Sequence, residues 1–127
     1  MADAVLDSSA VLAVLNGEQG ASVVAAVLDG ALVSSVNFAE VFGKLIERGV
    51  ASADARRAIE AIDLNVVDYD LPLAERTGEL IVGTRELGLS LGDRACLALA
   101  EREQAPAYTA DRRWSKARIG VQIRMIR

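Results

Sequence analysis

Short apolar runs alternate with longer amphipathic segments along this chain, and this alternation constrains the fold more than any other feature. Each apolar run has the length of a single strand, whereas the segments between the runs repeat their apolar residues with a helical period. The predicted strands cover residues 4–6, 31–35, 65–70, 107–110 and 121–126. Strands separated by helices predict a parallel sheet that is covered by helices on both faces.

Capping residues mark the boundaries of the predicted helices. Gly17, Gly30 and Gly49 follow or end amphipathic segments, and glycine commonly ends a helix. Ser52 is a typical first cap, and Pro72 suits the first turn of another helix. The predicted helices cover residues 8–17, 18–30, 37–49, 52–62, 72–87 and 91–103.

The size and composition of the chain suit one domain. It has 127 residues, of which 52% are hydrophobic, and it shows no linker-like or repeated segment. We therefore predict a single α/β domain over residues 1–127. No stretch reaches the ~18 apolar residues of a membrane span, and the start of the chain lacks the pattern of a secretory signal. These features predict a cytoplasmic protein with no membrane partner.

The chain contains no histidine and one cysteine, Cys96. Without histidine there is no Ser-His-Asp or Cys-His catalytic device and no His-ligated zinc or iron site. Cys96 lies in an apolar helical stretch, so we expect it to be a buried packing residue. Chemistry near neutral pH must then depend on carboxylates, hydroxyls, basic side chains or a hard metal ion.

Four acidic residues are predicted at one edge of the sheet. Asp7 and Asp111 directly follow predicted strands, Glu40 lies in the first turn of the helix after the second strand, and Asp93 begins a later helix. Ligands of parallel sheets bind beyond the carboxyl ends of the strands. Carboxylates gathered there without histidine or cysteine favour a hard divalent cation such as Mg²⁺. The hydroxyls of nearby residues could hold water, carboxylate or phosphate in support: Ser8, Ser9 and Thr109.

Each acid also has a purely structural explanation. Asp7 can cap the following helix, and Asp111 suits a turn. The other two acids end possible capping boxes that begin at Asn37 and Ser90. If Asp7 binds a metal instead, one of the two serines after it can take over the cap while the other faces the metal. Sequence reasoning leaves this division open.

Four segments resemble the PIN domain, and more narrowly a VapC-type toxin of a bacterial type II toxin–antitoxin system. They read VLDSSAVLAVL, SSVNFAE, LSLGDRACLALA and YTADRRW, and together they span nearly the whole chain. The resemblance implies a three-layer α/β/α, PIN-like fold with a five-stranded parallel sheet of order 3-2-1-4-5.

The resemblance also implies an activity and partners. Asp7, Glu40, Asp93 and Asp111 match the family's acidic quartet, which binds Mg²⁺ or Mn²⁺. Ser8 or Ser9 matches the small hydroxyl residue after the first acid, and Thr109 matches the threonine of the T-x-D segment. The implied activity is a metal-dependent endoribonuclease that cleaves tRNA or rRNA. The implied partners are a VapB-type antitoxin and a second toxin copy, with promoter DNA bound only through the antitoxin.

Basic residues follow the last acid, and three of them are candidates for contacting the RNA backbone: Arg112, Arg113 and Lys116. The alternative for the two arginines is pairing with the acids at the sheet edge. Trp114 can stack on a base or pack into the core. Some relatives carry a further acid or amide shortly after the fourth acid, whereas Ser115 and Lys116 stand here.

Two other functions stay open at this point. A Mg²⁺-dependent phosphatase also places an aspartate at a strand end, but the haloacid-dehalogenase-like type has a second aspartate two residues later, where this chain has Ser9. A non-catalytic module could use the same acids to bind a basic partner peptide. Cleavage of RNA in the presence of metal would discriminate between these possibilities.

Overall fold

A parallel sheet of five strands forms the centre of the computed structural model, which describes residues 2–127. The strands are short and pair in the order β3-β2-β1-β4-β5, so the predicted order 3-2-1-4-5 is confirmed. Their bounds are β1 Val5–Leu6, β2 Leu32–Ser34, β3 Asn65–Val67, β4 Ala107–Thr109 and β5 Ile123–Met125.

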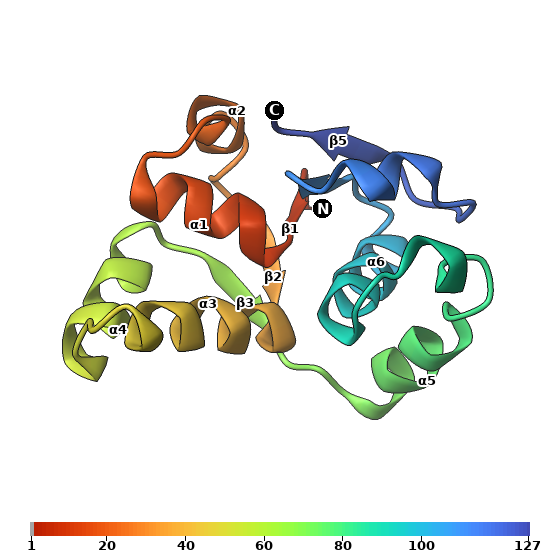
Figure 1. Cartoon of the computed structure of the whole chain (residues 1–127), viewed down its shortest axis with the longest axis horizontal. Helices are drawn as coiled ribbons and strands as arrows, with labels where there is room; N and C mark the ends of the chain where they lie inside the picture. Colours follow the sequence, from red (N-terminus) through yellow and green to blue (C-terminus); the bar gives the residue numbers. More distant parts are fainter. Residues whose placement is uncertain (1) are drawn as a thin grey trace.

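Helices cover both faces of the sheet, as the alternating pattern predicts (Figure 1). One layer holds α1 Ser8–Asn16, α2 Ala21–Ala25, α3 Ser35–Glu47 and α4 Ser52–Ala61. The other holds α5 Leu71–Glu79, α6 Leu91–Glu103 and two short 3₁₀ helices, η1 Arg85–Leu87 and η2 Arg112–Lys116. None of the helices within residues 2–127 combines the length and the apolar character that a membrane crossing requires.

The core is divided by the sheet into two clusters. Val5 and Leu6 are both fully buried although they are neighbours, because successive residues of a strand point to opposite faces. Leu6 packs with α1 to α4, whereas Val5 packs with α5 and α6. The central strand is therefore apolar on both sides, as expected for a covered parallel sheet.

Two predicted helices differ from the observed ones. The segment 72–87 is not one helix, because α5 ends at Glu79 and η1 begins only at Arg85. Gly83 lies between them with a φ of 96°, a left-handed conformation that a continuing helix does not allow. Within the segment 18–30, only the short helix α2 forms, and it follows Gly20, which has a φ of 97°. The sequence pattern correctly located the apolar residues of both segments but not these glycine-directed turns.

Candidate active site

The four predicted acids lie at one edge of the sheet, which we call the acidic rim. It is formed by the carboxyl ends of β1 and β4, by the first turns of α1 and α6, and by the second turn of α3. Figure 1 shows the starts of α1 and α3 beside the tip of β2 at this edge. Parallel strands bring these chain segments together, although they are far apart in the sequence.

Asp7 is the most deeply buried of the acids, with 3% of its surface exposed. Its Oδ1 accepts hydrogen bonds from the amide of Ala10 at 2.9 Å and from Ser9 Oγ at 2.6 Å, and its Oδ2 accepts one from Thr109 Oγ1 at 2.6 Å. Burial raises the pKa of Asp7 to about 6, against the opposing effect of these bonds, and the nearby charge of Asp93 raises it slightly further. Within residues 2–127, Asp7 is thus a buried carboxylate that is held by hydrogen bonds and forms no ion pair with a Lys or Arg side chain.

Neither serine takes over the helix cap, and the expectation that Asp7 can cap the following helix is confirmed. Asp7 itself caps α1, through the bond from Ala10. Ser9 Oγ donates to Asp7 and accepts from the amide of Ala110 at 2.9 Å, so it ties the start of α1 to the end of β4. Ser8 Oγ donates to Glu40 Oε1 at 2.7 Å. Both serines therefore position carboxylates, and the cap stays with Asp7.

Glu40 lies in the second turn of α3 rather than the first, and the expected capping box from Asn37 is absent. The helix begins one turn earlier, because Ser34 is its cap and accepts from the amide of Val36. Asn37 is instead fully buried, and its Nδ2 donates to Glu40 Oε1 at 2.9 Å and to the carbonyl of Gly92 at 3.0 Å. Asn37 thus links Glu40 to the first turn of α6.

Gly92 lies directly against the carboxylate of Glu40, and a side chain at this position would displace that carboxylate. A Cβ atom at this position would lie 2.3 Å from Glu40 Oε2 and 2.6 Å from Glu40 Oε1. The glutamate therefore rests directly on the backbone of α6. Sequence reasoning missed the roles of Asn37 and Gly92, although one signal was available for the former: Asn37, Val41 and Leu45 repeat on the buried face of α3, where an amide needs a polar partner.

Asp93 forms the capping box that the spacing from Ser90 predicts. The amide of Ser90 donates to Asp93 Oδ2 at 2.8 Å, and Ser90 Oγ accepts from the amide of Asp93 at 3.1 Å. Burial raises the pKa of Asp93, and the charge of Asp111 adds to this effect while the Ser90 hydrogen bonds oppose it. Asp93 thus helps to cap α6, and its carboxylate still lies on the acidic rim.

Asp111 is held by Arg113. The guanidinium donates to both carboxylate oxygens, with the shortest distance, 2.6 Å, between Nη2 and Oδ2. The same Nη2 lies 3.8 Å from Asp93 Oδ2, and Nη1 donates to the carbonyls of Leu87 and Gly88. The hydrogen bonds from Arg113 lower the pKa of Asp111. Of the two interpretations of Arg113, pairing with the rim acids is the one observed.

The four acids lie along the same rim, but in this structure their carboxylates do not come together around one point. Within residues 2–127, no group of three Asp, Glu, His or Cys side chains is arranged to hold a metal ion. The hydrogen bonds explain this spacing, because the protein's own donors hold Asp7, Glu40, Asp93 and Asp111 separately. The donors available are carboxylate and hydroxyl oxygens, and a buried carboxylate with a raised pKa is among them. This donor set fits Mg²⁺ or Mn²⁺.

The remaining predicted residues divide between surface and core. Arg112 and Lys116 are exposed on η2, beside the rim. Trp114 is fully buried and packs with the cluster around α6, so stacking on a base is excluded for this conformation. Cys96 is also fully buried, as expected, and burial raises the pKa of its thiol well above the ordinary value. Ser115 is exposed and offers no additional carboxylate.

Comparison of the sequence with models of protein families identifies one family. The model of the family described as "PIN domain" matches residues 4–120. No curated protein matches the sequence. Solved structures do match: DNA-bound VapBC from Salmonella typhimurium has 19% identity and a TM-score of 0.79, and the similarity covers 100% of both chains.

Two further structures are similar over most of their length. A toxin–antitoxin complex from Klebsiella pneumoniae has 19% identity and a TM-score of 0.72, with 98% of each chain covered. VapC20 from Mycobacterium tuberculosis, described as a sarcin–ricin loop cleaving toxin, has 20% identity and a TM-score of 0.71, with 89% of this chain and 93% of that chain covered. At these identities the likeness concerns the fold.

Proposed function

This chain belongs to the PIN domain family, and we propose that it is a Mg²⁺- or Mn²⁺-dependent endoribonuclease that acts as a VapC-type toxin. The observation that carries the proposal is the presence of four acidic residues along one rim of the sheet, two of which, Asp7 and Glu40, accept hydrogen bonds from hydroxyls. The structural likeness to VapC20, whose description names RNA cleavage, supports the same activity.

The residues that would hold the metal are Asp7, Asp93 and Asp111, with Glu40 beside them. A divalent ion bound there would activate water and neutralise charge on the scissile phosphate. Asp7 is positioned from three directions, by Ser9, Thr109 and the amide of Ala10. Asp7 therefore has a defined position on the rim, and Asp93 and Asp111 would move toward it when an ion binds.

Glu40 is suited to orient the attacking water and accept its proton. Both hydrogen bonds to Glu40 reach the same oxygen, Oε1, from Ser8 and Asn37. Within the described residues Oε2 accepts no hydrogen bond, so one oxygen is anchored and the other is available. A general base requires this combination of fixed orientation and a free acceptor.

The exposed cations of η2 would contact the substrate backbone. Arg112 and Lys116 make no ion pair in the described part of the chain, and both lie next to the acidic rim. Contacts of this kind with phosphates weaken as salt concentration rises. Arg113 could join them only after leaving Asp111.

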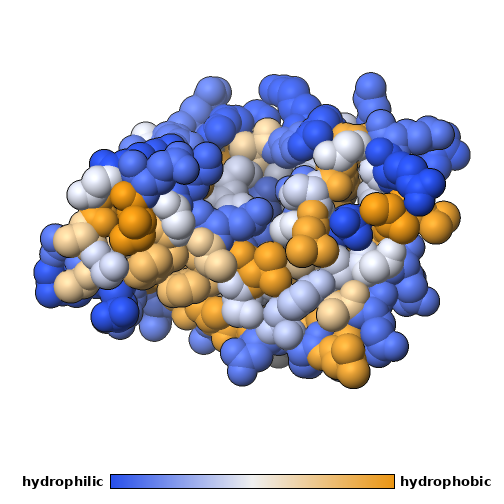
Figure 2. Space-filling model, turned by 60° about the horizontal axis from the view of Figure 1, so that its bottom comes forward, coloured by the Kyte–Doolittle hydropathy of each residue, from blue (hydrophilic) through white to orange (hydrophobic). Residues whose placement is uncertain are grey.

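The proposed partners are a VapB-type antitoxin, a second copy of this chain, and promoter DNA bound through the antitoxin. Structural neighbours described as VapBC or toxin–antitoxin complexes support the antitoxin. Figure 2 shows hydrophobic side chains in a broken band across one face, between hydrophilic borders. The exposed apolar side chains, among them Leu71, Val82 and Leu91, are available for contact with a protein partner.

The test is cleavage of labelled tRNA and rRNA fragments by the purified chain, with and without Mg²⁺ or Mn²⁺. We expect metal-dependent cleavage, and a loss of at least 100-fold for Asp7→Asn, which keeps the size of the side chain but removes its charge. Lys44→Ala, at an exposed position late in α3, is the matched control and should cleave normally. Cleavage that needs no metal, or an Asp7→Asn variant with full activity, would refute the proposal. Absence of cleavage together with tight binding of a basic peptide would instead indicate a non-catalytic module.

A further inference from the structure

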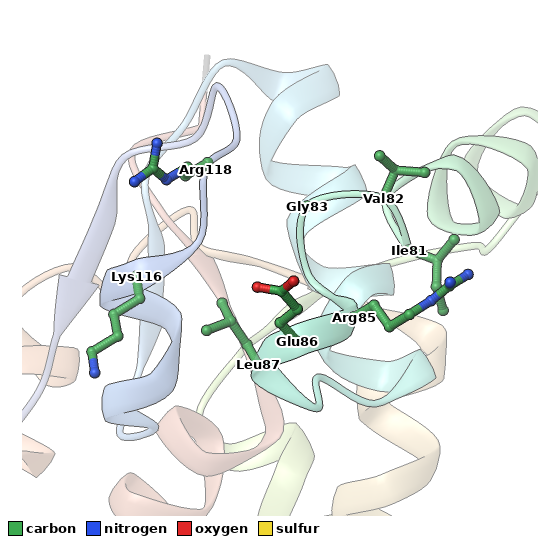
Figure 3. A pocket seen from close by; sticks show the side chains of 8 residues that line it. All are labelled: Ile81, Val82, Gly83, Arg85, Glu86, Leu87, Lys116 and Arg118. Carbon is green, nitrogen blue, oxygen red and sulfur yellow. The ribbon is translucent and has the colours of Figure 1, made fainter.

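A cavity of about 400 Å³ lies beside the acidic rim. One wall comes from the segment between α5 and η1 together with η1 itself, and the other from the end of η2 and the residues after it (Figure 3). The two walls approach closely at Gly83, where a Cβ atom would lie 3.6 Å from the carbonyl of Arg118. The cavity therefore exists because α5 stops early and the chain turns at this glycine.

The lining of the cavity combines an apolar surface with charges that have no partner. Val82 and Leu87 supply apolar surface. Glu86, Lys116 and Arg118 make no ion pair and no side-chain hydrogen bond within residues 2–127. In Figure 3 the Glu86 carboxylate rises between Leu87 and Gly83, whereas the side chains of Lys116 and Arg118 leave the opposite wall and end away from Glu86 and apart from each other.

Arg113 connects this cavity to the acidic rim. Its Nη1 donates to the carbonyl of Leu87 at 3.2 Å, and Leu87 lines the cavity. Its Nη2 holds Asp111 at 2.6 Å. Leu87 and Arg113 thus lie between the cavity and the rim, so the two are neighbouring regions of the surface that one extended RNA segment could contact.

We propose that this cavity is a nucleotide subsite that holds a guanosine next to the cleaved bond of a single-stranded RNA segment. Lys116 and Arg118, which are exposed and end apart from each other, would each turn to bind a phosphate beside the guanosine, the apolar wall of Leu87 and Val82 would contact its base, and Glu86 would accept hydrogen bonds from the base edge. The inference rests on the proposed nuclease function for the identity of the polymer.

Guanine is proposed because Glu86, the group that would meet the base edge, is a hydrogen-bond acceptor. An ionised carboxylate only accepts hydrogen bonds, and it can accept two in parallel. The Watson–Crick edge of guanine offers two adjacent donors, N1–H and the N2 amino group, whereas the other bases offer at most one group of donors beside acceptors. Unpaired bases in RNA are commonly read along this edge. A site in which Glu86 meets the base edge should therefore reject uracil most strongly, since the Arg85 side chain of the same wall extends away from Glu86 (Figure 3).

Binding of short RNA to the Asp7→Asn variant tests the subsite without cleavage. The probes are labelled hexauridylates with one guanosine, cytidine or adenosine placed at each position in turn, and the readout is fluorescence anisotropy. We expect the best guanosine probe to bind about tenfold tighter than hexauridylate, as for one two-bond base contact. Adding Glu86→Gln should abolish this preference, whereas Glu60→Gln, at an exposed position on α4, should keep it.

The role of the two cations is tested in the same assay. We expect Lys116→Ala with Arg118→Ala to weaken binding of every probe and to reduce the salt dependence by about 0.7 for each phosphate that is no longer neutralised. Arg48→Ala with Arg56→Ala, which removes two exposed cations at the end of the molecule near α4, is the matched control (Figure 1). All four substituted cations are exposed, so melting temperatures should stay within a few degrees.

The outcomes separate the subsite from the nuclease function. Equal affinity for all probes, or equal effects of the cavity and control variants, would overturn the subsite even if the wild-type chain cleaves RNA. Guanosine-dependent binding that Glu86→Gln abolishes would support the subsite even if the wild-type chain cleaves nothing, and in that case the nuclease proposal would fail alone.

Discussion

Substitution of Asp7 by asparagine should make the metal-free protein more stable at neutral pH, because a buried charge destabilises the folded state there. The pKa of Asp7 is raised from 3.8 to about 6. A raised pKa means that the folded state binds a proton more tightly than the unfolded state, so stability falls as pH rises through this interval. The shift corresponds to about 3 kcal/mol lost between pH 4 and pH 7.5.

The substitution also disturbs one hydrogen bond. Thr109 Oγ1 now donates to Asp7 Oδ2 and accepts from the amide of Asp111. In Asp7→Asn an amide nitrogen can replace this oxygen, and the threonine hydroxyl then loses its acceptor at a cost of about 1 kcal/mol. The expected net change is a gain of about 2 kcal/mol at pH 7.5, by combining these two magnitudes. Near pH 4 the variant should be no more stable than the wild type.

Urea unfolding followed by tryptophan fluorescence measures this difference directly. Trp114 is the sole tryptophan and is fully buried, so its emission reports on loss of the core. Both proteins are compared at several pH values in the presence of a chelator. If the free energies of unfolding of the two proteins changed with pH in parallel, Asp7 would carry no unfavourable charge, and the prediction would be refuted. Saturating Mg²⁺ should reverse the order at pH 7.5, since an ion at 100 times its Kd adds about 2.7 kcal/mol to the protein that binds it.

Two further substitutions test the geometry of the rim. Gly92→Ala should displace Glu40, because the new Cβ would lie 2.3 Å from Oε2, and should lower RNA cleavage at least tenfold while the melting temperature stays within a few degrees of wild type. Gly43→Ala, a helical glycine with open space around it, should leave cleavage unchanged, and equal activities of the two variants would contradict this role of Gly92. Arg113→Ala should free Asp111 and tighten Mn²⁺ binding severalfold by calorimetry, and unchanged or weaker binding would argue against competition between the guanidinium and the ion.

The layered fold could be predicted from the sequence because its signals are local and repeated. Apolar runs such as residues 4–6 are too short for helices, and they alternate with amphipathic segments that bury one face. The order of the strands came from the resemblance to a known family, since periodicity alone does not state which strands are neighbours. The acids could be placed at one rim because strand ends of a parallel sheet share an edge.

The contacts within the rim could not be predicted in the same way. Ser9 reaches the end of β4, and Asn37 reaches α6, across separations in sequence that no local pattern encodes. The helix expected over residues 72–87 failed for a different reason, because its apolar spacing continues through Gly83 although the backbone turns there. That turn creates the wall of the cavity next to the rim. The turn at Gly83, which the sequence pattern did not predict, thus forms a second region where RNA could bind.

The two interpretations of Arg113 can describe successive states of one site. Its guanidinium lies between Asp111 and Asp93 and compensates their charges. A divalent ion would take over this compensation, and the bonds from Arg113 to Asp111 would then lose most of their electrostatic gain. The side chain is about half exposed and anchored to carbonyls at the cavity wall. It can therefore turn from the acids to a phosphate without leaving the rim, so metal binding and RNA binding should be positively coupled, and Arg113→Ala should remove that coupling.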